Sequence, residues 1–204
     1  MFPKLYAITD PLVSRMSHLD QVERLIAGGA TLIQLRDKSS SPNDFYDSAV
    51  GCIRHAHACG ARIIINDRVD IAIAAAADGV HLGQDDLDPI AARRLLGPER
   101  IVGFSTHSLL QASEADRLPI DYIAIGPVFP TATKSNPDPV VGIELVAALR
   151  GRVSKPIVAI GGIVLARARE VIEAGADSVA VISDLYKTGS IEQRTKEYLL
   201  ELQG

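Results

Sequence analysis

Short runs rich in isoleucine and valine recur along the chain, and a helix-like stretch follows each of them. The runs are nearly continuous in apolar character, as is typical of parallel strands that are buried on both faces. About eight such units predict an α/β fold, a single-domain (βα)8 TIM barrel over residues 1–204, with a doubly wound sheet as the alternative. The expected strands span 5–9, 31–35, 62–65, 79–82, 101–104, 122–128, 156–160 and 178–182. The expected helices span 19–28, 43–59, 69–76, 88–96, 108–117, 142–150, 164–174 and 190–202.

Several of these helices end in the same way. The connections to the next strand read AGGATLI, ACGARII, AAADGVH and AGADSVA. In three of them a glycine can adopt the left-handed conformation that ends a helix. The recurrence indicates one structural unit that is repeated around a symmetrical fold.

Polar residues cluster directly after the apolar runs. The segments that follow successive runs are QLRDK, IND, HLGQDD, GFSTH, GPVFPTATK, IGGI and IS. Because the carboxyl ends of parallel strands meet at one end of a barrel, these segments predict a single ligand-binding mouth built by many loops. Polar loops after nearly every run favour the barrel over the doubly wound sheet, in which ligands gather at one switch point.

Composition excludes several classes of partner. The net charge of −4 and the lack of a basic run argue against nucleic-acid binding. No apolar run reaches the roughly 18 residues of a membrane span, and no signal peptide is visible.

Cys52 and Cys59 lie seven residues apart, about 10 Å along one helix, which is too far for a disulfide. We therefore expect two free, buried thiols in a cytoplasmic protein, with a homo-oligomer left open.

Two carboxylates stand at the ends of neighbouring predicted strands. Asn66 and Asp67 end the third strand, and Asp86 follows the fourth. Two carboxylates with an amide nearby form a hard oxygen site that suits Mg²⁺, which completes its shell with water and substrate phosphates. The alternative is that Asp67 caps the following helix and that Asp86 lies in an ordinary loop.

Gln34, Arg36 and Lys38 alternate after the second predicted strand. In an extended segment this spacing puts all three side chains on one side, and Asp37 on the other. One amide side chain and two positively charged side chains suit a ligand in which a polar ring carries a pyrophosphate. The alternative is that the two cations pair with surface acids.

The segment 130–140 is rich in proline and polar residues, and its length suits a mobile lid. Thr131, Thr133 and Lys134 lie at its base. Two hydroxyls and an ammonium at this position predict an anion site, with a polar surface turn as the alternative.

Ser105 and His107 follow the fifth predicted strand. They lack the glycine-flanked turn and the third partner of a nucleophilic serine, so we expect hydrogen-bonding groups rather than a nucleophile. The remaining histidines, at positions 18, 55, 57 and 81, we expect to be structural.

Gly161 and Gly162 follow the seventh predicted strand, and Ile182 and Ser183 follow the eighth. Many barrels bind phosphate at this place, because glycines let backbone N–H groups approach the ligand and a helix N-terminus adds its dipole. The pattern predicts a phosphate-ester site.

The joint occurrence of QLRDK, INDRVDIAIAAAADGVHLGQDD, GFSTH, GPVFPTATK, AIGGI and SVAVIS in this order closely resembles the thiamine phosphate synthase family. The resemblance extends from Tyr6 to Ser183. It implies a Mg²⁺-dependent transferase that joins a hydroxymethylpyrimidine pyrophosphate to a thiazole phosphate and releases pyrophosphate.

The resemblance also implies roles for individual residues. Gln34, Arg36 and Lys38 would hold the pyrimidine and its pyrophosphate, and Asn66 and Lys134 would also contact the pyrophosphate. The implied metal ligands are Asp67 and Asp86, Ser105 would lie by the pyrimidine, and the implied thiazole phosphate ligands are Thr131, Thr133, Gly162, Ile182 and Ser183.

The mechanism that the resemblance implies is dissociative. Pyrophosphate departs first and leaves a carbocation on the electron-rich aminopyrimidine. The thiazole nitrogen then captures this carbocation, so no protein nucleophile is needed. The implied catalytic residues are Arg36, Lys38, Ser105 and Lys134. Asp184 departs from the small residue that is more usual after Ser183, and we expect its carboxylate to point away from the phosphate.

Three other functions remain as alternatives. A thiazole tautomerase on the same fold would use His107 as a proton carrier and would need no metal. A regulatory barrel would need only the phosphate pocket. A sugar-phosphate isomerase would need a pair of catalytic bases, which the sequence does not offer.

Overall fold

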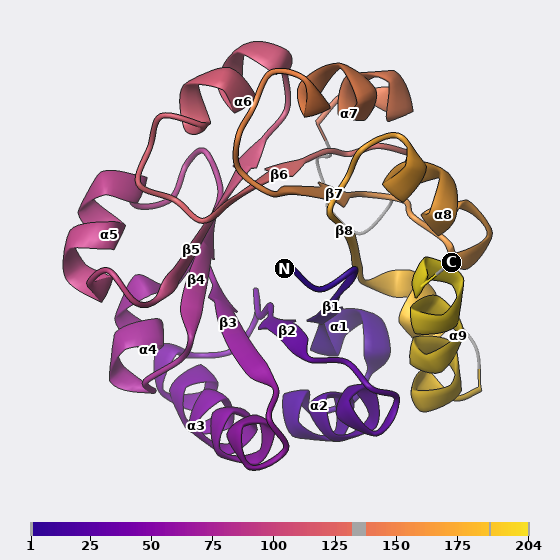
Figure 1. Ribbon diagram of the computed structural model, residues 1–204. Coiled ribbons are helices and arrows are strands. Elements are labelled where there is room, and N and C mark those ends of the chain that lie inside the picture. Colours follow the sequence, from indigo (N-terminus) through magenta and orange to yellow (C-terminus); the bar gives the residue numbers. More distant parts are fainter. Residues whose placement is uncertain (1, 132–137, 188, 204) are drawn as a thin grey trace.

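Eight parallel strands close into a barrel, and the helices form a ring around it (Figure 1). The structure is a computed structural model that describes residues 2–131, 138–187 and 189–203. The predicted (βα)8 barrel is confirmed, and the doubly wound alternative is wrong. The strands are β1 (Leu5–Thr9), β2 (Leu32–Leu35), β3 (Arg62–Asn66), β4 (Gly79–Leu82), β5 (Ile101–Thr106), β6 (Tyr122–Ile125), β7 (Ile157–Ile160) and β8 (Ser178–Val181).

The helices lie close to their expected positions, with two short additions. The sequence pattern did not predict α1 (Pro11–Ser14) or the 3-10 helix η1 (Ser183–Tyr186). The other helices are α2 (His18–Ala27), α3 (Pro42–Ala58), α4 (Val69–Ala74), α5 (Pro89–Leu96), α6 (Leu109–Ala115), α7 (Gly142–Arg150), α8 (Leu165–Glu173) and α9 (Ile191–Gln203).

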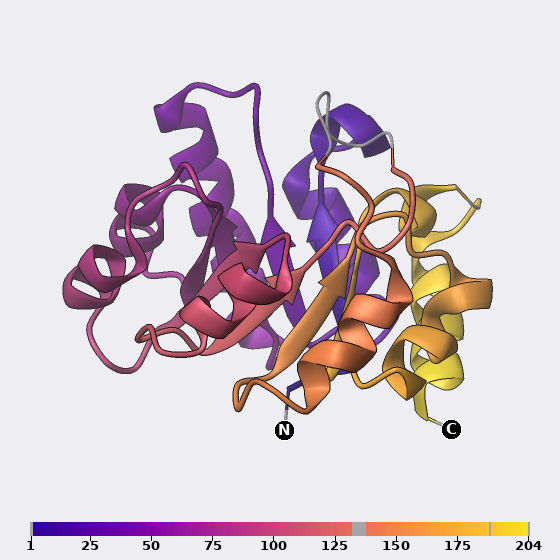
Figure 2. The same ribbon diagram turned by 90° about the horizontal axis from the view of Figure 1, so that it is seen from above.

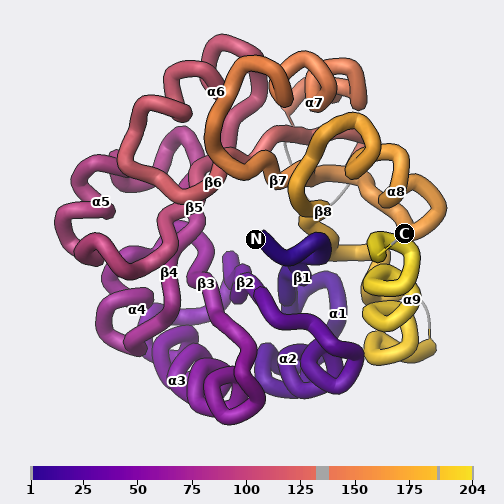
Figure 3. The backbone as a smooth tube through the Cα atoms, in the orientation of Figure 1, coloured from indigo at the N-terminus to yellow at the C-terminus, as the bar shows by residue number. Residues whose placement is uncertain are grey.

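Each strand pairs with its neighbours in the sequence, and β8 pairs with β1 to close the ring (Figure 3). Because the strands are parallel, their carboxyl ends meet at one end of the barrel. The marks N and C both lie at the opposite, lower edge in Figure 2. The loops that follow the strands are therefore free to build a site away from both termini.

The core has two layers, which explains the continuous apolar runs. Helices pack on the outside of the strands, where the larger cluster of buried residues lies. A smaller cluster shows the side chains that the barrel turns inward: Tyr6, Ile8, Leu32, Ile64, Tyr122, Ala124, Val158 and Ala180. Both faces of each strand are thus buried, as the lack of alternation predicted.

The expected glycine helix ends are confirmed. Gly29, Gly60 and Gly175 have φ values of 98°, 73° and 112°. In the fourth connection Ala76 adopts the same left-handed region, with φ of 56°. Each of these residues turns the chain from a helix into the following strand.

Two smaller expectations need correction. Strand β6 ends at Ile125 instead of 128, and a cis peptide bond joins Gly126 to Pro127 just beyond it. Both cysteines are free, but Cys52 is buried and Cys59 is exposed, since Cys59 stands at the end of α3. Across the described residues, every helix is too short or too polar to span a bilayer.

Candidate active site

A cavity of about 530 Å³ opens at the carboxyl ends of the strands. Residues from the loops after β2 to β8 line it, so the predicted mouth is present. Thr133, Lys134 and most of the expected lid, 130–140, lie outside the described residues. Every predicted site residue that is described lines this cavity: Gln34, Arg36, Lys38, Asn66, Asp67, Asp86, Ser105, His107, Thr131, Gly162, Ile182 and Ser183.

Asp67 and Asp86 face each other at one side of the cavity. Asp67 has a left-handed backbone with φ of 63°, and its N–H donates to the carbonyl of His81 on the next strand. Lys38 Nζ forms an ion pair with Asp67 Oδ2. The second carboxylate, Asp86, accepts a hydrogen bond from the Gly83 N–H at 2.7 Å.

The surroundings of Asp86 shift its pKa. Burial raises this pKa above its usual range, and the neighbouring Asp67 carboxyl raises it further. The Gly83 N–H and the Lys38 ammonium act in the opposite direction. Two carboxylates held together at the edge of a cavity repel one another, and a cation between them relieves that repulsion.

The donor set suits Mg²⁺ better than a softer metal. Among the described residues there is no group of three or more His, Cys, Asp or Glu side chains that could hold a metal ion. Two carboxylates are enough for Mg²⁺, which takes its remaining ligands from water and substrate phosphates. The capping alternative for Asp67 finds no support, because α4 has Arg68 at its N-cap and no side-chain cap hydrogen bond.

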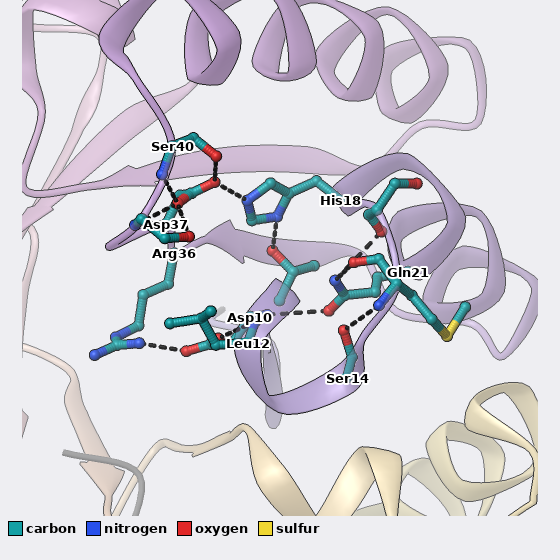
Figure 4. Close-up of polar contacts among 12 residues, drawn as sticks. Asp10, Leu12, Ser14, His18, Gln21, Arg36, Asp37 and Ser40 are labelled. Atoms are coloured by element: carbon teal, nitrogen blue, oxygen red, sulfur yellow. Dashed lines mark hydrogen bonds and ion pairs between the residues drawn. The ribbon is translucent and has the colours of Figure 1, made fainter. Parts of the chain in front are cut away.

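The three alternating residues line the cavity: Gln34 lies in β2, and Arg36 and Lys38 follow it. Their partners lie in or beside the site and are not acids of the outer surface. Gln34 is buried, and its Nε2 donates to the Tyr6 hydroxyl at 3.0 Å. Arg36 pairs with the buried carboxylate of Asp10, as Figure 4 shows. The alternative of pairing with surface acids is therefore wrong for Arg36, and Lys38 is paired inside the mouth with Asp67.

Asp37 points away from the cavity, as expected from its place between two inward residues. It bonds to His18, Ser39 and Ser40 (Figure 4). Partial burial alone would raise the pKa of Asp37, but hydrogen bonds from Ser39 and Ser40 and the nearby His18 lower it to about 2. Asp37 thus stays ionised and fixes the backbone that carries Arg36 and Lys38.

The opposite side of the cavity is a glycine turn. Gly161 and Gly162 both have positive φ, 98° and 64°. A Cβ on Gly162 would lie 2.4 Å from the carbonyl oxygen of Pro130, so only glycine fits beside this segment. The first turn of η1 adds Ser183 to the same wall.

Asp184 turns out of the cavity, which confirms the expectation for it. Its Oδ2 accepts hydrogen bonds from the Leu165 N–H, from Arg194 and from the Tyr198 hydroxyl. These partners belong to α8 and α9, outside the barrel. The carboxylate therefore does not oppose an anion that is bound at Ser183.

Ser105 and His107 lie on the wall between the two sides. Ser105 Oγ is 2.8 Å from His81 Nε2, and His107 Nδ1 is 2.6 Å from the carbonyl oxygen of Gly126. A nitrogen that faces a carbonyl must carry the proton, so His107 donates through Nδ1. Its Nε2 lies 3.5 Å from Asp138.

Comparison with known proteins decides the family. Residues 5–185 match the family model described as thiamine monophosphate synthase. The chain belongs to this family.

Individual members of the thiamine monophosphate synthase family match almost end to end. The thiamine-phosphate synthase of Koribacter versatilis is 47% identical, over 97% of this chain and 94% of that one. The protein of the same name from Methanospirillum hungatei is 44% identical, over 95% of both chains. The solved thiamine phosphate pyrophosphorylase of Pyrococcus furiosus is 35% identical, with a TM-score of 0.88 and coverage of 98% and 97%.

Sequence reasoning missed His81, which lines the cavity, and three residues that contact its lining: Asp10, Tyr6 and Tyr122. Asp10 pairs with Arg36. His81, which we expected to be only structural, lies on the cavity wall between Ser105 and Tyr122. Tyr6 and Tyr122 resemble ordinary core residues of their strands. A signal existed only for Asp10, which directly follows the first apolar run as the other site residues follow theirs.

Proposed function

We propose that this protein is a thiamine-phosphate synthase, an enzyme that transfers a pyrimidinylmethyl group from a hydroxymethylpyrimidine pyrophosphate to a thiazole phosphate. The observation that carries the proposal is the division of one cavity into two sides, in a chain of this family. One side holds two carboxylates with Arg36 and Lys38 and suits a pyrophosphate with its metal. The other is a glycine turn that suits a second phosphate.

Asp67 and Asp86 are the residues that would hold Mg²⁺. When bound, the ion would neutralise negative charge on the pyrophosphate oxygens. Asn66 would present its amide to the same pyrophosphate. The two neighbouring carboxylates support this assignment, because a cation bound between them would relieve their mutual repulsion.

The bond that breaks joins the pyrimidine methylene carbon to the pyrophosphate oxygen. Negative charge grows on the leaving group, where Arg36, Lys38 and Lys134 stabilise it as it forms. The electron-rich aminopyrimidine keeps the positive charge, with Gln34 and Ser105 orienting the ring. The thiazole nitrogen then donates its electron pair to the carbon, and no protein nucleophile takes part.

The thiazole phosphate binds on the glycine side. Backbone N–H groups near Gly162, Ile182 and Ser183 receive the phosphate, together with the hydroxyls of Thr131 and Thr133. Two free thiols suit a reducing compartment, and we place the reaction in the cytoplasm.

A direct assay tests the proposed function. The purified protein is mixed with both phosphorylated precursors, with and without Mg²⁺, and pyrophosphate and thiamine phosphate are measured. We expect equal amounts of the two products, and only with Mg²⁺. A folded protein that interconverts thiazole tautomers without coupling them to the pyrimidine would overturn the proposal in favour of a tautomerase.

A further inference from the structure

We propose that Asp184 is a positioning residue for the phosphate of the thiazole substrate. Its carboxylate lies behind the cavity wall and joins the two backbone segments that form the glycine side. The proposal rests on the proposed function, because it concerns how the phosphate side of that cavity keeps its shape. Asp184 does not line the cavity itself, and it acts through the backbone of both segments.

The two segments come from neighbouring strands. The first, 161–163, follows β7 and leads into α8, and the second, 182–183, follows β8 and begins η1. Every residue of both segments lines the cavity. The pairing of β7 with β8 brings the segments together, but it extends only to Ile160 and Ala180. Beyond this pair, another contact must set the spacing of the two segments.

Asp184 supplies such a contact. Its Oδ2 accepts a hydrogen bond at 3.1 Å from the N–H of Leu165, the first residue of α8. The N-cap residue of this helix, Val164, provides no side-chain hydrogen bond, so Asp184 takes the place of the missing cap. Asp184 directly follows Ser183, which lines the cavity, and Leu165 lies two positions after Ile163, which also lines it. The bond therefore connects the two segments directly behind the wall.

Helix α9 fixes the direction of this carboxylate. The same oxygen accepts from Arg194 Nη2 at 2.8 Å and from the Tyr198 hydroxyl at 2.7 Å. Burial and the bond to Asp184 raise the pKa of Tyr198, so its hydroxyl keeps the proton that it donates. Asp184 is 3% exposed and Tyr198 is 0% exposed. Since α9 packs beside α8 on the outside of the barrel (Figure 1), the carboxylate is held from behind.

Holding the two segments should favour binding because the site is ordered before the ligand arrives. Backbone N–H groups of both segments must point to one phosphate, and each misdirected group loses a charge-assisted hydrogen bond. Segments that are already fixed lose less conformational freedom on binding. The ion pair with Arg194 balances the charge of Asp184, so the carboxylate orders the site without repelling the anion.

Three variants separate this role from a general contribution to stability. Asp184→Ala removes the shared acceptor oxygen, and Asp184→Asn keeps one oxygen for the Leu165 N–H. Asp177→Ala is the matched control, because the Asp177 carboxylate also accepts from a backbone N–H and from an arginine. These donors are Ile157 at 2.8 Å and Arg150 at 2.6 Å. Asp177 directly precedes β8 and therefore lies at the end of the strand that is opposite the cavity.

The first experiment measures two dissociation constants by calorimetry, one for the thiazole phosphate and one for hydroxymethylpyrimidine pyrophosphate with Mg²⁺. We expect Asp184→Ala to bind the thiazole phosphate about tenfold or more weakly. Its affinity for the pyrophosphate should change by less than about twofold, since that ligand uses the other side of the cavity. Asp184→Asn should bind the thiazole phosphate within about threefold of the wild type. Asp177→Ala should lower the melting temperature and leave both constants unchanged.

The second experiment needs no variant and therefore does not depend on whether Asp184→Ala folds. If the bond to Leu165 favours phosphate binding, phosphate binding must favour that bond by the same factor. We expect the thiazole phosphate to slow hydrogen exchange of the Leu165 amide, measured by nuclear magnetic resonance, by about fivefold more than exchange of the Ile157 amide. Equal slowing of both amides would reflect only global stabilisation and would overturn the proposal.

Coupling activity of the wild type is measured in parallel. A wild type that binds the thiazole phosphate but makes no thiamine phosphate would refute the proposed function and still test Asp184. A wild type that does not bind the thiazole phosphate would refute both. With an active wild type, equal changes in the two ligand affinities of Asp184→Ala, or an effect of Asp177→Ala as large as that of Asp184→Ala, would refute only the role of Asp184.

Discussion

The Asp10 carboxylate joins Arg36 to helix α1. One oxygen, Oδ2, accepts from the Arg36 guanidinium, and the other accepts from the N–H groups of Leu12 and Val13 at 3.0 and 3.2 Å. The backbone N–H of Asp10 is itself held by the Gln21 side chain at 3.0 Å. The position of a cation in the cavity is thus set by the N-cap residue of α1, which directly follows the neighbouring strand β1.

We expect Asp10→Asn to weaken the reaction through Arg36. An amide has only one oxygen, so it cannot serve both the helix N-terminus and the guanidinium. Loss of a charge-assisted hydrogen bond should lower kcat/KM for the pyrimidine pyrophosphate by about 10- to 100-fold. Steady-state kinetics measure this, and Asp47→Asn, on the exposed surface of α3, is the control. Equal kinetics for the two variants would contradict the role of Asp10.

Removing one carboxylate of the facing pair should weaken the activation of the enzyme by Mg²⁺. In Asp86→Asn we expect turnover to fall about 100-fold or more, since the charge that holds the ion beside the leaving group is halved. The fold should survive, because the variant loses little more than the bond from Gly83. The check is a Mg²⁺ titration of activity, with Asp70→Asn on the exposed surface of α4 as control. Unchanged activity would remove the metal from the mechanism.

Gly162→Ala should destabilise the protein and weaken binding of the thiazole phosphate. Its φ is 64°, and the new Cβ would lie 2.4 Å from the Pro130 carbonyl oxygen. Strain and steric overlap together should lower the free energy of unfolding by about 2–4 kcal/mol. Gly60→Ala is the control, because Gly60 has a similar φ of 73° with nothing near its Cβ. Denaturant unfolding should show a loss of only about 1 kcal/mol there, and equal losses would show that the contact with Pro130 is unimportant.

The fold was predictable because the pattern that determines it recurs along the sequence. Strands buried on both faces need continuous apolar runs, and a closed parallel barrel then brings every following loop to one end. That is why residues as distant as Gln34 and Ser183 could be assigned to one cavity from sequence alone.

The remaining residues of the site could not be recognised from the sequence, because the strands that carry them are buried on both faces. When both faces of a strand are buried, no alternation shows which residues turn inward, so Tyr6 and Tyr122 could not be separated from the outer core. His81 follows Val80 in β4, and only the register with β5 shows that it meets Ser105. Asp10 precedes a helix of four residues, which is too short to give a periodic pattern.

His107→Ala should leave coupling nearly intact. The His107 ring donates through Nδ1 to the Gly126 carbonyl oxygen, which is a structural bond at the end of β6. A general acid or base contributes about 10²–10⁴-fold, so a fall of less than about tenfold would show that His107 carries no essential proton. The assay follows thiamine phosphate formation and thiazole tautomer interconversion together. If neither protein joined the pyrimidine to the thiazole, and His107→Ala lost the interconversion of thiazole tautomers, the result would favour the tautomerase.

His18 should make stability fall in mild acid. Its ring is buried between Thr9 Oγ1 at 2.7 Å and Asp37 Oδ2 at 3.3 Å. Burial lowers the pKa of His18 below its ordinary 6.5, against the opposing effects of Asp37 and Asp10. The unfolded chain therefore binds the proton more readily than the folded one, and the free energy of unfolding decreases as the pH drops below 6.5.

The comparison that isolates this group is the wild type against His18→Gln, whose amide can bond to both Thr9 and Asp37 without titrating. Chemical unfolding from about pH 8 to about pH 5.5 should show a steeper loss of stability in the wild type than in the variant. Parallel curves would mean that His18 does not titrate differently in the two states. A wild type that gains stability relative to the variant on acidification would mean that attraction to Asp37 outweighs burial, and the sign of the pKa shift would be wrong.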